Sequence, residues 1–445
     1  MPPLESLAPP SPDTLFANAK TAYELQDFEQ AARLCNQILE THQHPLVANL
    51  LGMSLLKMDK PEFGERVLHE AIALDPNCVA ALANLGNYYR ENMRIKQAEE
   101  LLQAAYKLRP DNHQVNHNMS VLCLESGRFD EGLRFARKAQ EINPDHEATK
   151  HTLSLALLQN GQYDEGTELY EARKTVFLRD KSPLPAYTGG KAKVIIRQEQ
   201  GFGDTLMVSR WLPKLQEMGA DVTLVAPTAL YKLMKDSGLC DVHNADADMN
   251  SYTHHLWTMD LMRMFGKDWA NISGKPYFTA DPQLVEKWCM MLGKKKKPRI
   301  GFCWSGSSRK DNPHAFIIDK RRSLCISEAR SLMHGIDAQW VNLTRELGLP
   351  DSTDFSAQIK DFAEMAGLLK NLDLVVTVDT ALCHLAGGLG VNTICLHRYD
   401  MCWRWHPYTE QTPLYEGMRH FRQPAPFDWQ SVIGEVRDEI TKLYN

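Results

Sequence analysis

Two glycine-rich turns in the second half of the chain contain the residue types that hold a phosphate ester and activate a hydroxyl group. The first turn, Q-E-Q-G-F-G-D-T at Gln198–Thr205, follows the apolar run Val194–Ile196. Its two glycines let the backbone approach a ligand, and Asp204 is a carboxylate of the kind that acts as a general base. Asp204 also stands where an aspartate caps a helix, and the two roles are compatible. The spacing differs from the G-x-G-x-x-G dinucleotide fingerprint.

The second turn, V-D-T-A-L-C-H-L-A-G-G-L-G at Val378–Gly390, again leads from a buried strand into a helix. Free N–H groups at such a helix start suit a diphosphate, and open α/β sheets bind ligands at the carboxyl ends of their strands. We therefore expect Asp379 and Thr380 to contact the ligand rather than only to cap the helix. His384 lies one helical turn further on, where it is either a ligand contact or a packed, hydrogen-bonded core histidine.

A third group of residues combines hydroxyls with cations after the apolar run Ile300–Trp304. It comprises W-S-G-S-S-R-K at Trp304–Lys310 and K-R-R-S at Lys320–Ser323. Such groups stabilise a departing phosphate, and we expect only one or two of the cations to do so. The aromatic pair in W-R-W at Trp403–Trp405 stacks on a base or sugar, or packs in the core.

The elements that position these turns alternate between strand and helix, which predicts parallel sheets with helices on both faces. Helices are expected at Thr205–Met218 and Asp361–Asn371, and an amphipathic helix closes the chain from Trp429. The predicted strands are Val194–Ile196, Val222–Val225, Ile300–Trp304, Trp340–Leu343, Leu374–Val378 and Thr393–Leu396. The lysine run at 294–297 is expected to be a solvated linker between two α/β domains.

The first third of the chain is built from a repeat of 34 residues. Prolines at 76, 110 and 144 share this period, and small residues recur with it at Gly52, Gly86, Ser120 and Ser154. Two antiparallel helices that cross closely need small residues at the crossing point, and neighbouring units must stack to bury their apolar faces. About five units are expected, the first of them degenerate. The candidates for lining a binding groove are Asn84, Asn87, Asn116, His117 and Asn118.

Composition narrows the class of protein. The formal net charge of -6 gives no overall basic field for nucleic acid or an anionic membrane, and no apolar run is long enough to span a bilayer. The N-terminus lacks the pattern of a secretory signal. Ten cysteines without a C-x-x-C pair favour reduced, buried thiols in a cytoplasmic protein.

The 34-residue period resembles the tetratricopeptide repeat. The region from about Lys193 onward resembles the C-terminal region of bacterial tetratricopeptide-repeat glycosyltransferases, which is similar to the heptosyltransferases and, more distantly, to the O-GlcNAc transferases. The resemblance rests on E-Q-G-x-G-D-T, W-x-G and R-R-S, on the phrase at Leu372–Gly387, on W-R-W, and on M-R-x-F-R-Q near the end. The chain departs from the family pattern at His255–Asp260 and Asn342–Thr344.

This resemblance implies an α + α/β architecture: a tetratricopeptide solenoid, then a GT-B fold of two Rossmann-like domains facing a cleft, with the last helix crossing back. The expected boundaries are 1–13 for a flexible N-terminus, 14–178 for the repeats, 179–191 for a linker, 192–293 and 298–428 for the two domains, and 429–445 for the closing helix. It also implies a nucleotide-sugar substrate, no cofactor and no obligatory metal.

Carried over residue by residue, the resemblance makes Asp204 the base and places Asp379, Thr380 and His384 against the donor phosphate and sugar. Apart from the resemblance, His254 and His255 are second candidates for the base. The acceptor side is expected to include Gly201, Phe202, Gly203 and His255. The donor side is expected to include Ser305, Gly306, Ser307, Arg309, Lys310, Arg322, Asp379, Thr380, Ala381 and His384.

The leading hypothesis is sugar transfer, inverting or retaining, from a nucleotide-sugar to a protein hydroxyl, with the repeats recruiting the acceptor. Flagellin-like acceptors are implied by what some related repeat glycosyltransferases modify. The alternatives are a lipopolysaccharide or glycolipid transferase, and a non-catalytic repeat scaffold with a relict transferase domain. The nucleotide, the sugar and the acceptor stay open.

Overall fold

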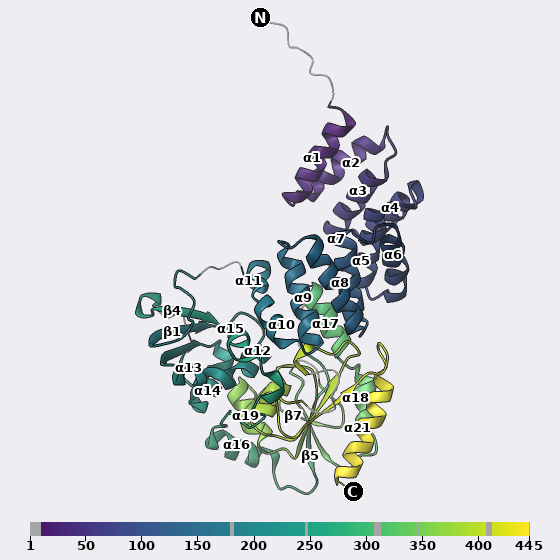
Figure 1. The fold of residues 1–445 in the computed structure, drawn as a ribbon. Helices are drawn as coiled ribbons and strands as arrows, with labels where there is room; N and C mark the ends of the chain where they lie inside the picture. The colour runs from purple at the N-terminus through teal and green to yellow at the C-terminus, as the bar shows by residue number, and fades with distance from the viewer. Residues whose placement is uncertain are drawn as a thin grey trace, which may run out of the picture. The chain divides into compact units, whose positions relative to one another are not determined.

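The protein was examined as a computed structural model that describes residues 10–178, 182–244, 248–306, 313–345, 348–405 and 412–444, with backbone alone at 270 and 313–316. The chain divides into two compact units, Met1–Thr152 and Leu153–Asn445 (Figure 1). No helix in these described ranges combines the length and apolar character needed to cross a membrane.

The first unit is an array of paired antiparallel helices, as the 34-residue period predicts. Its helices are α1 (Pro12–Glu24), α2 (Phe28–Leu39), α3 (Pro45–Lys57), α4 (Pro61–Leu74), α5 (Val79–Glu91), α6 (Ile95–Leu108), α7 (His113–Glu125), α8 (Phe129–Ile142) and the start of α9 (Glu147–Gln159). The predicted small residues do lie at the crossings: a Cβ added to Gly52 would lie 2.8 Å from Leu68 Cγ, and one added to Gly86 would lie 2.8 Å from Leu102 Cγ. Close helix crossing therefore explains this part of the repeat pattern.

Two of the proposed groove residues serve the array itself. Asn116 and Asn118 are buried, and their side-chain amides donate to the backbone carbonyls of Pro110 and Ala83. Their interpretation as groove-lining residues was wrong, because each amide satisfies backbone acceptors within the array. His117 is partly buried, and its Nδ1 lies 3.3 Å from the Thr149 hydroxyl.

The second unit begins inside α9 and continues through α10 (Tyr163–Leu169) and α11 (Ala172–Phe177). The compact unit therefore starts earlier than the boundary expected at residue 179, since residues of these helices share a core with the first sheet. The segment expected to be a free linker also packs: Ala186 pairs in parallel with His255, and Tyr187 is fully buried.

The first sheet has the order β3-β2-β1-β4, and all of its described pairs are parallel. Its strands are β1 (Ala192–Arg197), β2 (Ala220–Val225), β3 (Asp241–His243) and β4 (His254–Trp257). The helices of this region are α12 (Phe202–Val208), α13 (Leu212–Glu217), α14 (Thr228–Ser237), α15 (Asp260–Phe265) and α16 (Pro282–Leu292), with 3-10 turns at Ser209–Trp211, Met249–Ser251 and Trp269–Asn271. The single helix predicted at Thr205–Met218 is thus two helices joined by a 3-10 turn, and it starts three residues earlier.

The second sheet has the order β10-β9-β8-β5-β6-β7, also parallel. Its strands are β5 (Arg299–Cys303), β6 (Gln339–Asn342), β7 (Thr353–Asp354), β8 (Leu374–Val378), β9 (Thr393–His397) and β10 (Met418–Arg422). The helices are α17 (Pro313–Arg322), α18 (Ile326–Met333), α19 (Phe362–Leu369), α20 (Ala381–Gly388) and α21 (Trp429–Tyr444), with a 3-10 turn at Trp403–Trp405. Counted along the chain within this sheet, the order is 6-5-4-1-2-3, the doubly wound order of Rossmann-type sheets.

The closing helix α21 packs on the second sheet beside α18, and both lie at the same side of the sheet in Figure 1. Its residues Val432, Ile433, Val436 and Ile440 are buried as predicted, whereas Leu443 is 52% exposed. The expectation that this helix crosses back to the other domain was wrong, because its apolar face is used by the core of the second sheet.

Candidate functional site

Both predicted turns lie at the points where the strand order of their sheets reverses. In the first sheet, β1 and β4 end together, with Arg197 in register with Trp257. In the second sheet, β5 and β8 end together, with Cys303 in register with Thr377. Open α/β sheets bind ligands in the crevice outside the carboxyl ends of the strands at such a reversal.

The two turns meet each other. A Cβ added to Gly203 in α12 would lie 2.9 Å from His384 Cδ2 and 3.3 Å from Ala381 Cα, both in α20. One residue earlier, the ring of Phe202 lies edge-on to Phe362 of α19, with centroids 5.5 Å apart. Only glycine at position 203 allows the two helix starts to approach this closely.

Asp204 is held by an arginine that the sequence analysis did not single out. Arg404 Nη2 lies 2.5 Å from Asp204 Oδ1, and the two side chains are 15% and 19% exposed. Burial alone lowers the pKa of the Arg404 guanidinium, but the Asp204 carboxylate raises that pKa well above its ordinary value. The helix cap is Gly201, and Asp204 is the third helical residue, so its interpretation as an N-cap was wrong.

His384 is a packed core histidine in this structure. Its Nδ1 lies 2.8 Å from the Tyr415 hydroxyl, and its ring stacks on Trp405 with centroids 4.8 Å apart. Burial lowers the pKa of His384 to about 3, so the imidazole is neutral at physiological pH. Trp405 and Trp403 are both buried, which places the two predicted stacking rings in the core.

Thr380 caps α20, since its hydroxyl accepts a hydrogen bond of 3.3 Å from the N–H of Leu382. In the described part of the chain, neither the N–H of Ala381 nor the carboxylate of Asp379 has a hydrogen-bond partner. A helix start with a free N–H group attracts an anion.

Arg322 ties the third predicted group of residues to this helix start. Its Nη1 donates 2.8 Å to the carbonyl of Asp379, and its Nη2 donates 2.6 Å to Asp319. Its Nε is buried and has no partner among the described residues. A Cβ on Gly306 would lie 2.9 Å from Nη2, so this glycine makes room for the guanidinium.

The loop after β5 is fixed to Ser323, the residue that directly follows α17. Ser305 Oγ lies 3.1 Å from Ser323 Oγ, and the N–H of Gly306 donates to the same oxygen at 3.2 Å. Arg321 is engaged elsewhere, 2.7 Å from Asp400. Ser307, Arg309 and Lys310 lie outside the described residues.

His255 is not brought to this place by its described contacts. It is buried on β4, where its backbone pairs with the segment around Ala186 and its ring lies edge-on to Trp257 at 5.1 Å. The role expected of it on the acceptor side stays a prediction.

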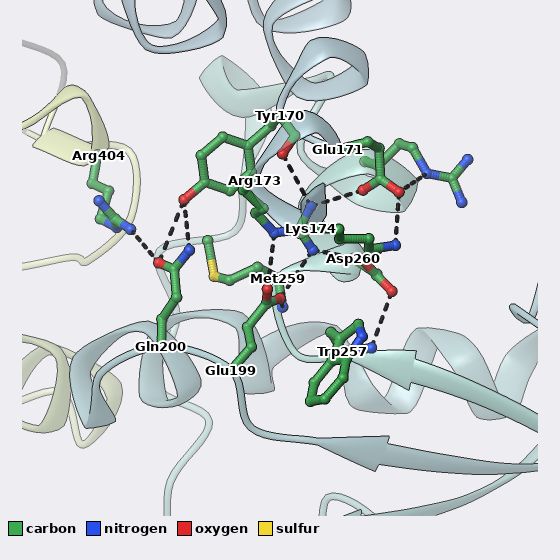
Figure 2. Close-up of polar contacts among 11 residues, drawn as sticks. Tyr170, Glu171, Arg173, Lys174, Glu199, Gln200, Trp257, Met259, Asp260 and Arg404 are labelled. Atoms are coloured by element: carbon green, nitrogen blue, oxygen red, sulfur yellow. Dashed lines mark hydrogen bonds and ion pairs between the residues drawn. The ribbon is translucent and has the colours of Figure 1, made fainter. Parts of the chain in front are cut away.

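Behind the first turn lies a buried charge network that sequence reasoning missed (Figure 2). Arg173 of α11 donates to both carboxylate oxygens of Glu199, at 3.0 and 2.9 Å, and lies 2.5 Å from Asp260. All three side chains are 1% exposed. Burial raises the pKa of Glu199, while Arg173 lowers it again. The N–H of Met259 also donates to Glu199, at 2.7 Å.

A second path links the same helices to Asp204. Gln200 Nε2 donates 2.9 Å to the Tyr170 hydroxyl, and Arg404 donates 3.3 Å to Gln200 Oε1. Figure 2 shows Tyr170, Gln200 and Arg404 in a row beside the Arg173 network. The turn that contains Asp204 is therefore held from behind by two contacts with α10 and α11.

These groups define the chemistry that the site can support. A free N–H group at a helix start and an arginine with unused donors suit a phosphate group. The start of α20 contacts α12 at Gly203, the residue before Asp204, so a phosphate-activated substrate held at this helix start would lie near a carboxylate that can accept a proton from a hydroxyl.

Comparison with known families finds two matches, each over part of the chain. Residues 358–422, which contain α19, β8, α20, β9 and β10, match the family described as Glycosyltransferase family 9 (heptosyltransferase). Residues 49–113 and 85–147 match the tetratricopeptide repeat. The chain thus contains segments similar to the tetratricopeptide repeat and a later segment similar to glycosyltransferase family 9. The family 9 match includes Asp379, Thr380 and His384, but not Asp204.

Solved structures that resemble the chain cover mainly helical segments. MamA from AMB-1 is 20% identical over 38% of this chain and 93% of its own, with a TM-score of 0.29. PilF of Pseudomonas aeruginosa is 16% identical over 47% and 86%, with a TM-score of 0.36. A thermophilic TPR protein of Thermus thermophilus is 18% identical over 38% and 93%, with a TM-score of 0.34. No curated protein matches the sequence.

Proposed function

We propose that this chain transfers a sugar from a nucleotide-sugar to a hydroxyl group of a protein that the repeats bind. The observation that carries the proposal is the contact of Gly203 with Ala381 and His384, which brings the two turns at the strand reversals together. With the family 9 match on one side and an aspartate on the other, this arrangement supports a GT-B enzyme that holds its donor on the second sheet.

The donor diphosphate is expected to bind at the start of α20. There the N–H of Ala381 is free, and Arg322 uses two of its five N–H donors on protein oxygens. Stabilising the charge on the departing diphosphate with such fixed donors lowers the barrier to transfer. No metal or other cofactor takes part in this proposed step.

Asp204 is the proposed base. Its Oδ1 is held by Arg404, and its Oδ2 has no hydrogen-bond partner in the described part of the chain. Arg404 fixes the carboxylate, while Oδ2 is left to accept a proton from the acceptor hydroxyl. The alternative is that Asp204 only anchors Arg404.

The acceptor class follows from the repeats, which are of a type that presents a surface to another polypeptide. A glycolipid acceptor is the second candidate, because the matching family is described as heptosyltransferases. A flagellin-like protein is one acceptor to test within the first class.

Donor binding can be tested by thermal-shift and calorimetric titration of the full chain with UDP, GDP, ADP and CMP. Binding to the folded state raises its apparent stability. We expect one nucleotide to bind and Arg322→Met to weaken it about tenfold or more, whereas the exposed control Arg330→Gln leaves binding unchanged. If none of the four nucleotides binds, the chain is a scaffold and the proposal fails.

The role of Asp204 can be tested once a donor is known, by transfer to protein and glycolipid acceptors. We expect Asp204→Asn to lower kcat at least 100-fold while donor affinity is retained. If Asp204 is only an anchor for Arg404, then Arg404→Leu lowers kcat as much as Asp204→Asn does, and the double variant is no worse than either.

A further inference from the structure

A buried cluster of sulfur and nitrogen atoms lies at the edge of the second sheet, beside the site already described. Among the described residues, one ligand atom each from Cys395, His397 and His420 lie within 4.8 Å of one another. The side chains of these three residues are at most 9% exposed. Thiol sulfur and imidazole nitrogen are the ligands that zinc and other soft divalent cations prefer.

The parallel pairing of β9 and β10 builds this cluster. Cys395 is in register with His420 on the neighbouring strand, and His397 lies two residues further along β9, on the same face as Cys395. Helix α20 covers that face and adds a second thiol, since Cys383 Sγ lies 3.1 Å from Cys395 Sγ. Three soft ligands therefore gather on two neighbouring strands, and a second thiol lies beside one of them on α20.

Without an ion, the cluster leaves polar atoms unsatisfied. His397 Nε2 lies 2.7 Å from His420 Nδ1, so the two imidazoles can share one hydrogen bond. The other ring nitrogens, His397 Nδ1 and His420 Nε2, are buried without a partner in the described part of the chain. An ion bound between the two facing nitrogens would take the place of their hydrogen bond, so the two unpartnered nitrogens are not its ligands.

We propose that Cys395, His397 and His420 bind a zinc ion, with Cys383 as the fourth ligand. Bond lengths of about 2.3 Å to sulfur and about 2.0 Å to nitrogen give tetrahedral edges of about 3.8 Å between sulfurs and about 3.3 Å between nitrogens. The observed S–S and N–N separations of 3.1 and 2.7 Å lie within about 1 Å of these values. Cys383 stands outside the group of three, so its side chain must move toward the histidines to complete the set. On binding, the two thiols release their protons to solvent, and no electron is transferred.

The surroundings of Cys383 fit a metal ligand. The N–H of Thr380 already donates to Cys383 Sγ at 3.5 Å, which is the kind of hydrogen bond that supports a metal-bound thiolate. A closed site with four protein ligands is structural rather than catalytic. The ion would fasten the start of α20, with Asp379 and Thr380, to strands β9 and β10.

The test is the metal content of the full chain, purified without a polyhistidine tag and measured by elemental analysis. We expect about one zinc ion per chain. We expect it to be lost in Cys395→Ser and in His420→Leu, and retained in the control Cys289→Ser, which changes an exposed cysteine. A metal-free wild-type chain, or zinc retained in both cluster variants, overturns the proposal.

A second measurement covers the case in which the variants fail to fold. The wild-type chain is produced in a medium with cobalt in place of zinc, and its absorption spectrum is recorded. Thiolate-to-cobalt charge-transfer bands and intense tetrahedral d–d bands are expected. If a folded wild-type chain excludes cobalt, the two histidines only share a hydrogen bond. Neither measurement needs a sugar donor, so the outcome is independent of the proposed transferase activity.

Discussion

Replacing Arg173 with leucine is expected to destabilise the second unit strongly, although the residue precedes both sheets in the chain. The guanidinium donates twice to Glu199, and it also donates to Asp260, to Glu171 and to the carbonyl of Tyr170. Leucine fills most of the volume of the aliphatic stem and removes every one of these donors. Glu199 and Asp260 then stay buried without their main counterion.

The size of the effect follows from what each carboxylate keeps. Glu199 keeps the N–H of Met259, and Asp260 keeps the N–H of Trp257 and the ammonium of Lys174 at 2.7 Å. Removing one partner of a buried ion pair costs about 3–5 kcal/mol, because the remaining charge is not compensated. The matched control is Lys174→Ala. Its ammonium contacts the same Asp260 but is 30% exposed, so the expected loss is about 1 kcal/mol or less.

Urea denaturation followed by tryptophan fluorescence measures this difference. All nine tryptophans lie between Trp211 and Trp429, so the signal reports the second unit. With a slope of about 3 kcal/mol per molar urea, Arg173→Leu lowers the midpoint by about 1–1.7 M. A loss within about 1 kcal/mol of that of Lys174→Ala would show that the network adds little to stability, and the reasoning would be refuted.

Two further predictions concern other parts of the molecule. Burial, with smaller contributions from neighbouring histidines and an arginine, lowers the pKa of His117 from 6.5 to about 4. Between about pH 6.5 and pH 4, His117 therefore binds a proton in the unfolded chain but not in the folded chain. The free energy of unfolding falls as pH falls through this range, by up to about 3 kcal/mol. His117→Gln should flatten this pH dependence in urea titrations followed by circular dichroism, whereas the exposed control His42→Gln should not. If the unfolding free energy changes equally with pH in the wild type and both variants, the assignment to His117 is contradicted. Gly203→Ala should cost about 1–3 kcal/mol, because its Cβ would lie 2.9 Å from the buried His384 ring. In Gly201→Ala the nearest atom is 3.5 Å away, so fluorescence-monitored unfolding should separate the two variants, and equal midpoints would argue against a close contact of α12 with α20.

The features that the sequence could predict are those with a local periodic signal. The spacing of prolines and small residues predicts the repeat helices, and the crossings at Gly52 and Gly86 confirm the reason for it. A fully buried parallel strand appears in the sequence as a short apolar run. For this reason Leu374–Val378 was predicted with the same bounds that the structure gives to β8. The strands β3, β4, β7 and β10 were missed, because they are short or interrupted by polar residues such as His254 and Arg419.

The site was predictable only where its residues follow strands. Asp379 and Thr380 stand directly after a buried apolar run, Gly203 stands in the turn that follows another, and the fold brings them to the strand reversals. Arg173 and Arg404 gave no such signal, because their partners are 26 and 200 residues away in the chain. An arginine inside an amphipathic repeat helix looks like a solvated cation, and only the packing of α11 against the first sheet shows that it is buried.

The boundary of the second unit therefore does not coincide with the change in sequence pattern. In the segment expected to be a linker, Ala186 pairs in parallel with His255 of β4. Earlier in the chain, Tyr163 stacks on Trp269 with centroids 5.8 Å apart. Because the Arg173 network and the Tyr170–Gln200 hydrogen bond both end on the turn of Asp204, α10 and α11 belong to the structure that holds this turn. These two helices thus set the position of the proposed base.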